Sequence, residues 1–213
     1  MEDIFLKTRG FFMIKNVVFD IGMVLITFDW DKYVHKLFND EVTEKAVTDA
    51  TWRNPDWNEL DKGVLSAEEV CSLFQKAGKG YEEQVRLAFY RMGECPKQQP
   101  YAIPWIKELK AKGLNVYYLS NYSYHLIDVC PEALSFREYM DGGVFSCEEK
   151  LTKPDIRIYE RLCEKYGLVP SECLFTDDLA ANIEGAKKAG FNAVRFESYE
   201  KNYDEISRLI ADK

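Results

Sequence analysis

Four short segments of this chain carry polar side chains of the types that transfer a phosphoryl group. In chain order they are Asp20 in VVFD, Ser120 and Asn121 in YYLSN, Lys153 in KPD, and Asp177 and Asp178 in LFTDD. Each polar group ends or follows an apolar run of strand type. Because ligands of open α/β sheets bind at the carboxyl ends of the strands, we predict that the four segments converge on one place.

Asp20 is the candidate nucleophile. A carboxylate at the C-terminal end of a strand can attack phosphorus and form an aspartyl-phosphate, which divides one displacement into two. Taken alone, the sequence FDIG fits an aspartate that caps a turn at least as well. The presence of the other three segments favours the nucleophile.

The acidic doublet of Asp177 and Asp178 indicates a cation. Two adjacent carboxylates repel each other unless a cation lies between them and Asp20. A few hard oxygen ligands are what Mg²⁺ binds in proteins, together with waters and substrate phosphate. The alternative is that Asp178 caps a helix beginning at Leu179, but one acid would suffice for that.

Lys153, Ser120 and Asn121 could contact the phosphate itself. The ammonium of Lys153 can pair with Asp20 and with a phosphate oxygen as a point charge. The Ser120 hydroxyl, the Asn121 amide and the backbone N–H groups at the end of their strand can donate to the other phosphate oxygens. Alone, an exposed lysine and a Ser-Asn turn are ordinary features.

From residue 104 onwards the sequence has the pattern of an α/β protein. Strand and helix patterns alternate there, with the second helix beginning near Ser123 and a turn expected at 141–143. Successive elements are expected at 104–112, 115–120, 123 onwards, 144–146, 156–166, 173–177, 179–189 and 192–196. Asp155 is placed as an N-cap, and Gly167 follows the end of the same helix. This alternation predicts a parallel sheet with helices on both faces.

Residues from about 35 to 95 lack strand patterning. They form helical segments broken at 54–55 and 62–63, with a capping box from Ser66 to Glu69 and a stop near Gly78 and Gly80. We therefore expect an α/β core made of residues 1–33 and 96–213, with an all-helical cap at 34–95 that folds over the active edge of the sheet.

Composition narrows the class of protein. The chain has 213 residues, of which 46% are hydrophobic, and a net charge of −8, which argues against nucleic acid or an anionic membrane as a partner. Its six cysteines lack a CxxC pair and fit reduced thiols, and no apolar run approaches the roughly 18 residues of a membrane span. We expect a cytoplasmic monomer or weak dimer that binds a small phosphorylated metabolite. Residues 1–12 are expected to lie outside the fold.

The four segments resemble, in order, the four motifs of the haloacid dehalogenase-like (HAD) superfamily, over about residues 14–197. The stretch from Lys153 to Phe191 is similar to the subfamily that includes bacterial sugar-phosphate phosphatases and the N-terminal phosphatase domain of soluble epoxide hydrolases. The resemblance implies a Rossmann-like core with a small helical cap inserted after the first motif.

The resemblance also implies roles for individual residues. Asp20 would be nucleophile and Mg²⁺ ligand, Asp178 a direct ligand with Asp177 beside it, and Gly22 a ligand through its carbonyl. Ser120 and Asn121 would bind phosphate, Lys153 would bridge, and Asn182 would orient the metal loop.

The chain departs from the family pattern at Gly22. Most family phosphatases have an aspartate there, which protonates the leaving group and then activates water; some relatives have glycine followed by asparagine, where this chain has Met23. Asp29 and Asp31 could replace the missing acid, although ordinary loop carboxylates are expected.

Three functions are compatible with these residues. The first is a Mg²⁺-dependent phosphatase acting on a sugar phosphate or similar metabolite through an aspartyl-phosphate. The second is a binding protein that lost turnover through Gly22, and the third is a metal-independent dehalogenase. The acidic doublet disfavours the third, because a haloacid site has no use for Mg²⁺.

Overall fold

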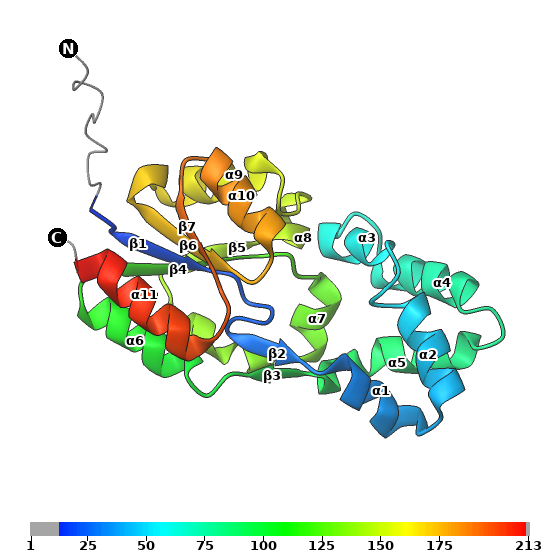
Figure 1. Cartoon of the computed structure of the whole chain (residues 1–213). Coiled ribbons are helices and arrows are strands. Elements are labelled where there is room, and N and C mark those ends of the chain that lie inside the picture. Colours follow the sequence, from blue (N-terminus) through cyan, green and yellow to red (C-terminus); the bar gives the residue numbers. More distant parts are fainter. Residues whose placement is uncertain (1–12, 212–213) are drawn as a thin grey trace, which may run out of the picture.

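A five-stranded parallel sheet forms the centre of the protein in the computed structural model, which describes residues 13–211 (Figure 1). Its strands follow the order β5-β4-β1-β6-β7. In chain order they are β1 (Asn16–Phe19), β4 (Asn115–Ser120), β5 (Gly142–Phe145), β6 (Cys173–Asp177) and β7 (Asn192–Arg195). All of them were expected from the apolar runs of the sequence, and the α/β prediction is confirmed.

The register of the sheet brings three strand ends together. Strand β1 lies between β4 and β6, so that Phe19 is opposite Tyr118 on one side and Thr176 on the other. The chain leaves all three strands at the same edge of the sheet because the strands are parallel. Asp20, the Ser120–Asn121 pair and the acidic doublet therefore lie at one carboxyl edge.

Helices cover both faces of this sheet, as Figure 1 shows. One face packs on α6 (Ala102–Ala111) and α11 (Tyr199–Ala211), through residues such as Trp105 and Ile206. The other face packs on α9 (Ile156–Tyr166) and α10 (Ala180–Lys188), through residues such as Tyr159 and Ile183. Burial on both faces explains why the strands read as continuous apolar runs.

Shorter elements complete the core at its edges. They are α7 (Tyr124–Val129), α8 (Ser146–Glu149) and the 3-10 helices η1 (Met92–Glu94), η2 (Pro131–Tyr139) and η3 (Pro170–Glu172). The turn expected at 141–143 is instead the start of β5. Asp141 accepts a hydrogen bond from the Val116 N–H at 2.8 Å, which aligns the incoming chain with β4.

The helical insertion lies at the carboxyl edge of the sheet (Figure 1). Its helices are α1 (Trp30–Phe38), α2 (Glu41–Ala50), α3 (Trp57–Lys62), α4 (Ala67–Ala77) and α5 (Glu82–Tyr90). The capping box at Ser66 is present, and Gly63 ends α3 in the left-handed conformation with φ 62°. Helix α1 begins four residues before the expected boundary, and the cap limits 34–95 stay a prediction.

The sequence patterns did not reveal the ribbon that joins the insertion to the core. Strand β2 (Ile26–Phe28) pairs antiparallel with β3 (Pro96–Gln98) where the chain leaves the core and where it returns. Each strand has only three residues, and their partners are about 70 positions apart, so no local pattern could indicate the pair.

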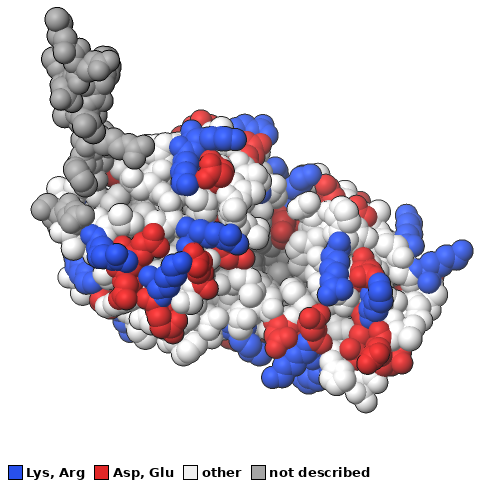
Figure 2. All heavy atoms as spheres, viewed as in Figure 1, with Lys and Arg blue, Asp and Glu red and all other residues white. Residues whose placement is uncertain are grey.

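The described surface carries both signs of charge, interspersed on the face that Figure 2 shows. None of the helices between residues 13 and 211 combines the length and hydropathy needed to cross a bilayer. The six cysteines all fall within this range and are unpaired. The prediction for residues 1–12 lies outside the described part of the chain.

Candidate active site

Three carboxylates meet at the carboxyl edge of the sheet. Oxygen atoms of Asp20, Asp177 and Asp178 all lie within 4.8 Å of one another. Asp177 is fully buried, Asp20 is 7% exposed and Asp178 is half-buried. The backbone fixes Asp20 from both sides, because its N–H donates to the Thr176 carbonyl at 2.9 Å and the next N–H, of Ile21, donates to its Oδ1 at 2.7 Å.

Lys153 is inserted among these carboxylates. Its Nζ lies 2.8 Å from Asp20 Oδ1 and 2.6 Å from Asp177 Oδ2, and the residue is only 4% exposed. The Asn121 side chain holds the Lys153 backbone at both polar groups: it accepts from the N–H at 2.8 Å and donates to the carbonyl at 3.1 Å. The residue that follows β4 thereby positions the lysine, and both polar atoms of the Asn121 amide are already hydrogen-bonded within the protein.

The two members of the acidic doublet have different surroundings. Asp177 accepts from the Asn182 amide at 3.1 and 2.9 Å and from the Leu179 N–H at 2.8 Å. The residue that binds the start of α10 is thus Asp177, so the alternative of Asp178 as a helix cap is wrong. The Asp178 carboxyl has no hydrogen bond to any other described residue, which leaves it available to a ligand.

The charges at this edge do not balance. Burial raises the pKa of Asp20 to about 7, against the opposing effect of Lys153, and the charge of Asp177 adds to the rise. Partial burial and the Asp177 charge likewise raise the pKa of Asp178. Burial opposes the charge of Lys153, but Asp20 and Asp177 outweigh it and raise its pKa. One ammonium thus faces three carboxylates, and hard oxygen donors with excess negative charge fit Mg²⁺.

The other residues expected at the site lie at the same edge. Ser120 is buried at the end of β4, and its hydroxyl helps to hold down the pKa of Asp20. Gly22 has no left-handed backbone, and a Cβ added there would have its nearest neighbour, Phe28 Cε2, at 3.5 Å. Met23 does adopt a left-handed conformation, with φ 57°, which asparagine adopts more readily.

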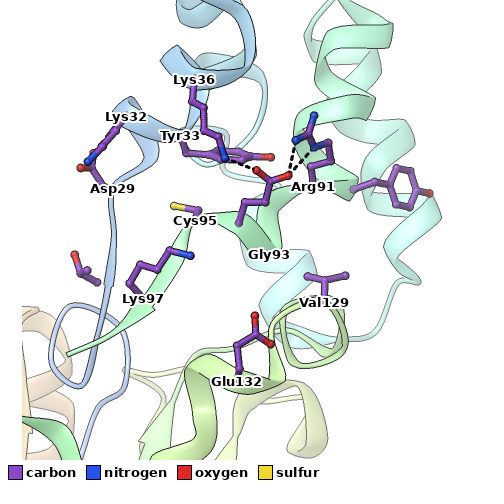
Figure 3. Close-up of a pocket in the computed structure, with 13 residues that line it drawn as sticks. Asp29, Lys32, Tyr33, Lys36, Arg91, Gly93, Cys95, Lys97, Val129 and Glu132 are labelled. Carbon is purple, nitrogen blue, oxygen red and sulfur yellow. Dashed lines mark hydrogen bonds and ion pairs between the residues drawn. The ribbon is translucent and has the colours of Figure 1, made fainter. Parts of the chain in front are cut away.

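Neither of the two downstream aspartates faces this edge. Asp29 is the N-cap of α1, where its Oδ1 accepts from the Lys32 N–H at 3.1 Å. It lines a pocket of about 780 Å³ beside the β2–β3 ribbon, and none of the site residues described above lines that pocket (Figure 3). Asp31 is exposed and pairs with Arg53 at 3.7 Å. Both are the ordinary carboxylates that the sequence suggested.

A further carboxyl group, that of Asp61 on α3, was missed by sequence reasoning. It is 8% exposed, and burial raises its pKa; the charge of Asp20 adds to the rise and that of Lys153 opposes it. The sequence NELDKG around it has no strand pattern and resembles a solvated helix end. Only the packing of α3 against the core buries it, so no local signal could have found it.

Lys153 should contribute strongly to folding stability. Breaking a buried ion pair by removing one partner costs about 3–5 kcal/mol, because it leaves buried charge uncompensated. We therefore expect Lys153→Met to lower the free energy of unfolding by that amount in metal-free buffer near neutral pH, as measured by urea denaturation. Lys187→Met, which removes an exposed pair with Glu184, should change it by less than about 0.5 kcal/mol. A loss under about 1 kcal/mol in Lys153→Met would contradict this.

Comparisons with known proteins agree with this geometry. Residues 14–190 match a model of the haloacid dehalogenase-like hydrolase family. The D-ribitol-5-phosphate phosphatase of Bacteroides thetaiotaomicron is 28% identical over 87% of this chain and 93% of its own length. The (S)-2-haloacid dehalogenase 4A of Burkholderia cepacia is 30% identical over 65% of this chain, which spans 58% of that protein. The chain spans only 19% of a mouse (Mus musculus) relative, acyl-CoA dehydrogenase family member 10, at 28% identity over 92% of this chain.

Solved structures share the fold. A HAD family enzyme from Bacteroides thetaiotaomicron, crystallised with magnesium and inorganic phosphate, matches with a TM-score of 0.67 at 22% identity. The match covers 89% of this chain and 99% of that one. The architecture of core and helical insertion is therefore common to both proteins.

Proposed function

Because this chain belongs to the haloacid dehalogenase-like hydrolases, we propose that it is a Mg²⁺-dependent phosphatase that hydrolyses the phosphomonoester of a small metabolite, a sugar phosphate or a closely similar compound. The observation that carries the proposal is the group of three carboxylates around one buried lysine. A phosphatase needs a cation at this place, whereas displacement of a halide does not.

The proposed reaction begins at Asp20. Both the Lys153 ammonium and the Ile21 N–H bind Oδ1, so Oδ2 is the oxygen free to attack phosphorus. The attack forms an aspartyl-phosphate and releases the alcohol, and water then hydrolyses this intermediate. In this reaction Lys153 would hold the nucleophile in place, and the buried Ser120 hydroxyl at the end of β4 would donate to a phosphate oxygen.

The metal would be held by the carboxylates of Asp20 and Asp178 and the carbonyl of Gly22, with Asp177 beside them. When bound there, Mg²⁺ supplies charge that screens Asp20 from the phosphate and neutralises the charge that develops during transfer. Asp177 is already bonded to Lys153, Leu179 and Asn182, which suits it to orienting this set of ligands. The relative crystallised with magnesium and phosphate supports this choice of cation.

The substrate class rests on the relatives. The D-ribitol-5-phosphate phosphatase aligns along almost its whole length, and its name places a phosphorylated polyol in its site. Dehalogenases also occur among the relatives, so the proposal must be tested against halide release.

The test is an assay of the purified protein against both substrate classes. Phosphate release from p-nitrophenyl phosphate and a panel of sugar and polyol phosphates should be measured with Mg²⁺ and with excess EDTA. Release of halide from a 2-haloacid should be measured under the same two conditions. We expect phosphate release that requires Mg²⁺ and no halide release. Halide release that persists in EDTA, without phosphatase activity, would refute the proposal in favour of a dehalogenase.

A further inference from the structure

Gly22 leaves the proposed phosphatase without a proton donor next to Asp20. A poor leaving group such as a sugar alkoxide needs that proton, and Asp29 and Asp31 face elsewhere. We propose that Asp61, on α3 of the helical insertion, donates the proton to the leaving oxygen and then accepts one from the attacking water. This inference rests on the proposed phosphatase function and assigns one of its catalytic groups.

Burial singles out Asp61 among the acidic residues. Between residues 13 and 211 only three carboxylates are buried: Asp20, Asp177 and Asp61. The first two belong to the cluster around Lys153, whereas the Asp61 carboxyl has no hydrogen bond to any described residue. Burying an ionisable carboxyl group is unfavourable, so one that lies outside that cluster calls for a functional explanation.

Hydrogen bonds hold Asp61 at the carboxyl edge of the sheet. The Ser146 hydroxyl, directly after β5, donates to the Asp61 carbonyl at 2.6 Å. The Ser146 hydroxyl oxygen in turn accepts from the Tyr122 N–H at 2.9 Å, and Tyr122 directly follows Asn121. Two hydrogen bonds therefore connect the backbone of Asp61 to the segment expected to bind phosphate.

Close packing reinforces this connection. Helix α3 ends at Gly63, where a Cβ would lie 2.7 Å from the Cys147 Cβ, so only glycine permits such a close approach to α8. The Lys150 ammonium also donates to the Gly63 carbonyl. Figure 1 shows α3 beside α8 at the carboxyl edge of the sheet. The insertion thus holds one buried carboxyl group, that of Asp61, beside the carboxyl edge of the sheet.

The surroundings of Asp61 allow it to exchange a proton near neutral pH. Burial raises its pKa to about 7, the charge of Asp20 adds to the rise, and the Lys153 ammonium opposes it. The charge of Asp61 also acts on two other titratable groups, Tyr122 and Cys147. Burial raises the pKa of both, so both stay neutral near pH 7. A group with a pKa near the working pH is an effective general acid and general base.

Asp61 donates one proton in the first step of the proposed reaction and takes one back in the second. As Asp20 Oδ2 attacks phosphorus, the ester P–O bond breaks and the leaving oxygen takes the proton of Asp61, giving the alcohol and the Asp61 carboxylate. Water then attacks the phosphorus of the aspartyl-phosphate and gives one proton to Asp61. The bond between phosphorus and Asp20 breaks, phosphate leaves, and both aspartates return to their starting states.

Asp61→Asn tests the proposal through its dependence on the leaving group. In this variant kcat/KM for an alkyl phosphate such as a sugar phosphate should fall by about 10²–10⁴-fold. For p-nitrophenyl phosphate, whose leaving group departs without a proton, kcat/KM should fall by less than about tenfold. Glu59→Gln is the matched control, because Glu59 lies on the same helix but pairs with Lys62 at 2.8 Å; it should change neither value more than about twofold.

A second variant restores the proton donor at another place. Gly22 has room for a side chain, so Gly22→Asp in the Asp61→Asn background should raise the alkyl kcat/KM by about tenfold or more. In the wild type, where Asp61 already donates, Gly22→Asp should leave the ratio of alkyl to aryl kcat/KM nearly unchanged.

The thermal transition checks that Asp61→Asn folds normally. The folded-state pKa of about 7 is above that of the unfolded chain, so this carboxyl stabilises the fold at low pH and loses that contribution as pH rises through 7. The variant should therefore be no less stable than the wild type at about pH 8.

Two outcomes would overturn the assignment of Asp61. One is an equal loss for alkyl and aryl substrates, which would give Asp61 a binding or structural role. The other is full alkyl activity in a folded Asp61→Asn variant. A wild-type protein that hydrolyses neither class with Mg²⁺ present would instead refute the proposed phosphatase function itself.

Discussion

Asp20→Asn should abolish phosphatase activity, with kcat/KM falling on the order of 10⁴-fold or more, while the protein stays folded. A neutral amide is a poor nucleophile and a weak metal ligand. The fold should persist because Lys153 keeps its bond to Asp177 at 2.6 Å. Burial also raises the pKa of Asp20 to about 7, so removing the charge relieves an unfavourable burial above that pH.

The measurement is kcat/KM for p-nitrophenyl phosphate at saturating Mg²⁺, with a thermal transition recorded for each protein. Asp31→Asn is a matched control, since this aspartate is exposed and pairs loosely with Arg53 at 3.7 Å. Its activity should stay within about twofold of the wild type. A folded Asp20→Asn variant with near wild-type turnover would show that Asp20 is not the nucleophile.

Removal of the metal should have an effect of similar size. Exhaustive chelation should eliminate turnover, and added Mg²⁺ should restore it. Asp178→Asn should raise the Mg²⁺ concentration needed for half-maximal activity by at least about tenfold. The substitution should disturb little else, because the Asp178 carboxyl has no hydrogen bond to any other described residue and is only half-buried.

The control for Asp178 comes from the helix that follows it. Glu184→Gln removes an exposed carboxylate on α10 that pairs with Lys187 at 2.9 Å, and it should leave the Mg²⁺ requirement unchanged. Asp178→Asn should also weaken Mg²⁺ more than Lys153→Ala does, since only the first removes a ligand. Full activity after chelation would overturn the metal assignment and favour a metal-independent function such as that of a dehalogenase.

The parallel core could be predicted because its signals are local. Strands buried on both faces read as apolar runs, and the polar residue after each run marks the carboxyl edge. The helix ends at Ser66 and Asp155 were predicted by the same kind of local rule, since a capping side chain bonds within its own first turn. The placement of Asp20, Lys153 and the doublet at one edge followed from these elements.

The remaining features depend on contacts between distant segments. Asp61 resembles a solvated residue until α3 packs against α8, and β2 finds β3 only after the insertion has folded. The different surroundings of the two residues of the doublet could not be predicted either. Asp177 and Asp178 are the same residue type, and only the fold places Lys153 and Asn182 around Asp177. Neighbouring residues of one type can therefore be told apart only in three dimensions.

The central claim, that Asp20 carries the phosphoryl group, can be tested by trapping the intermediate. The wild-type protein would be mixed with a phosphorylated substrate and Mg²⁺, quenched in acid during turnover and reduced with borohydride, which converts an aspartyl-phosphate to homoserine. Peptide mass spectrometry would then locate the change. We expect homoserine at position 20, dependent on substrate and Mg²⁺ and absent from Asp20→Asn. Turnover with an unmodified Asp20 at every quench time, or with the change at another residue, would contradict the account.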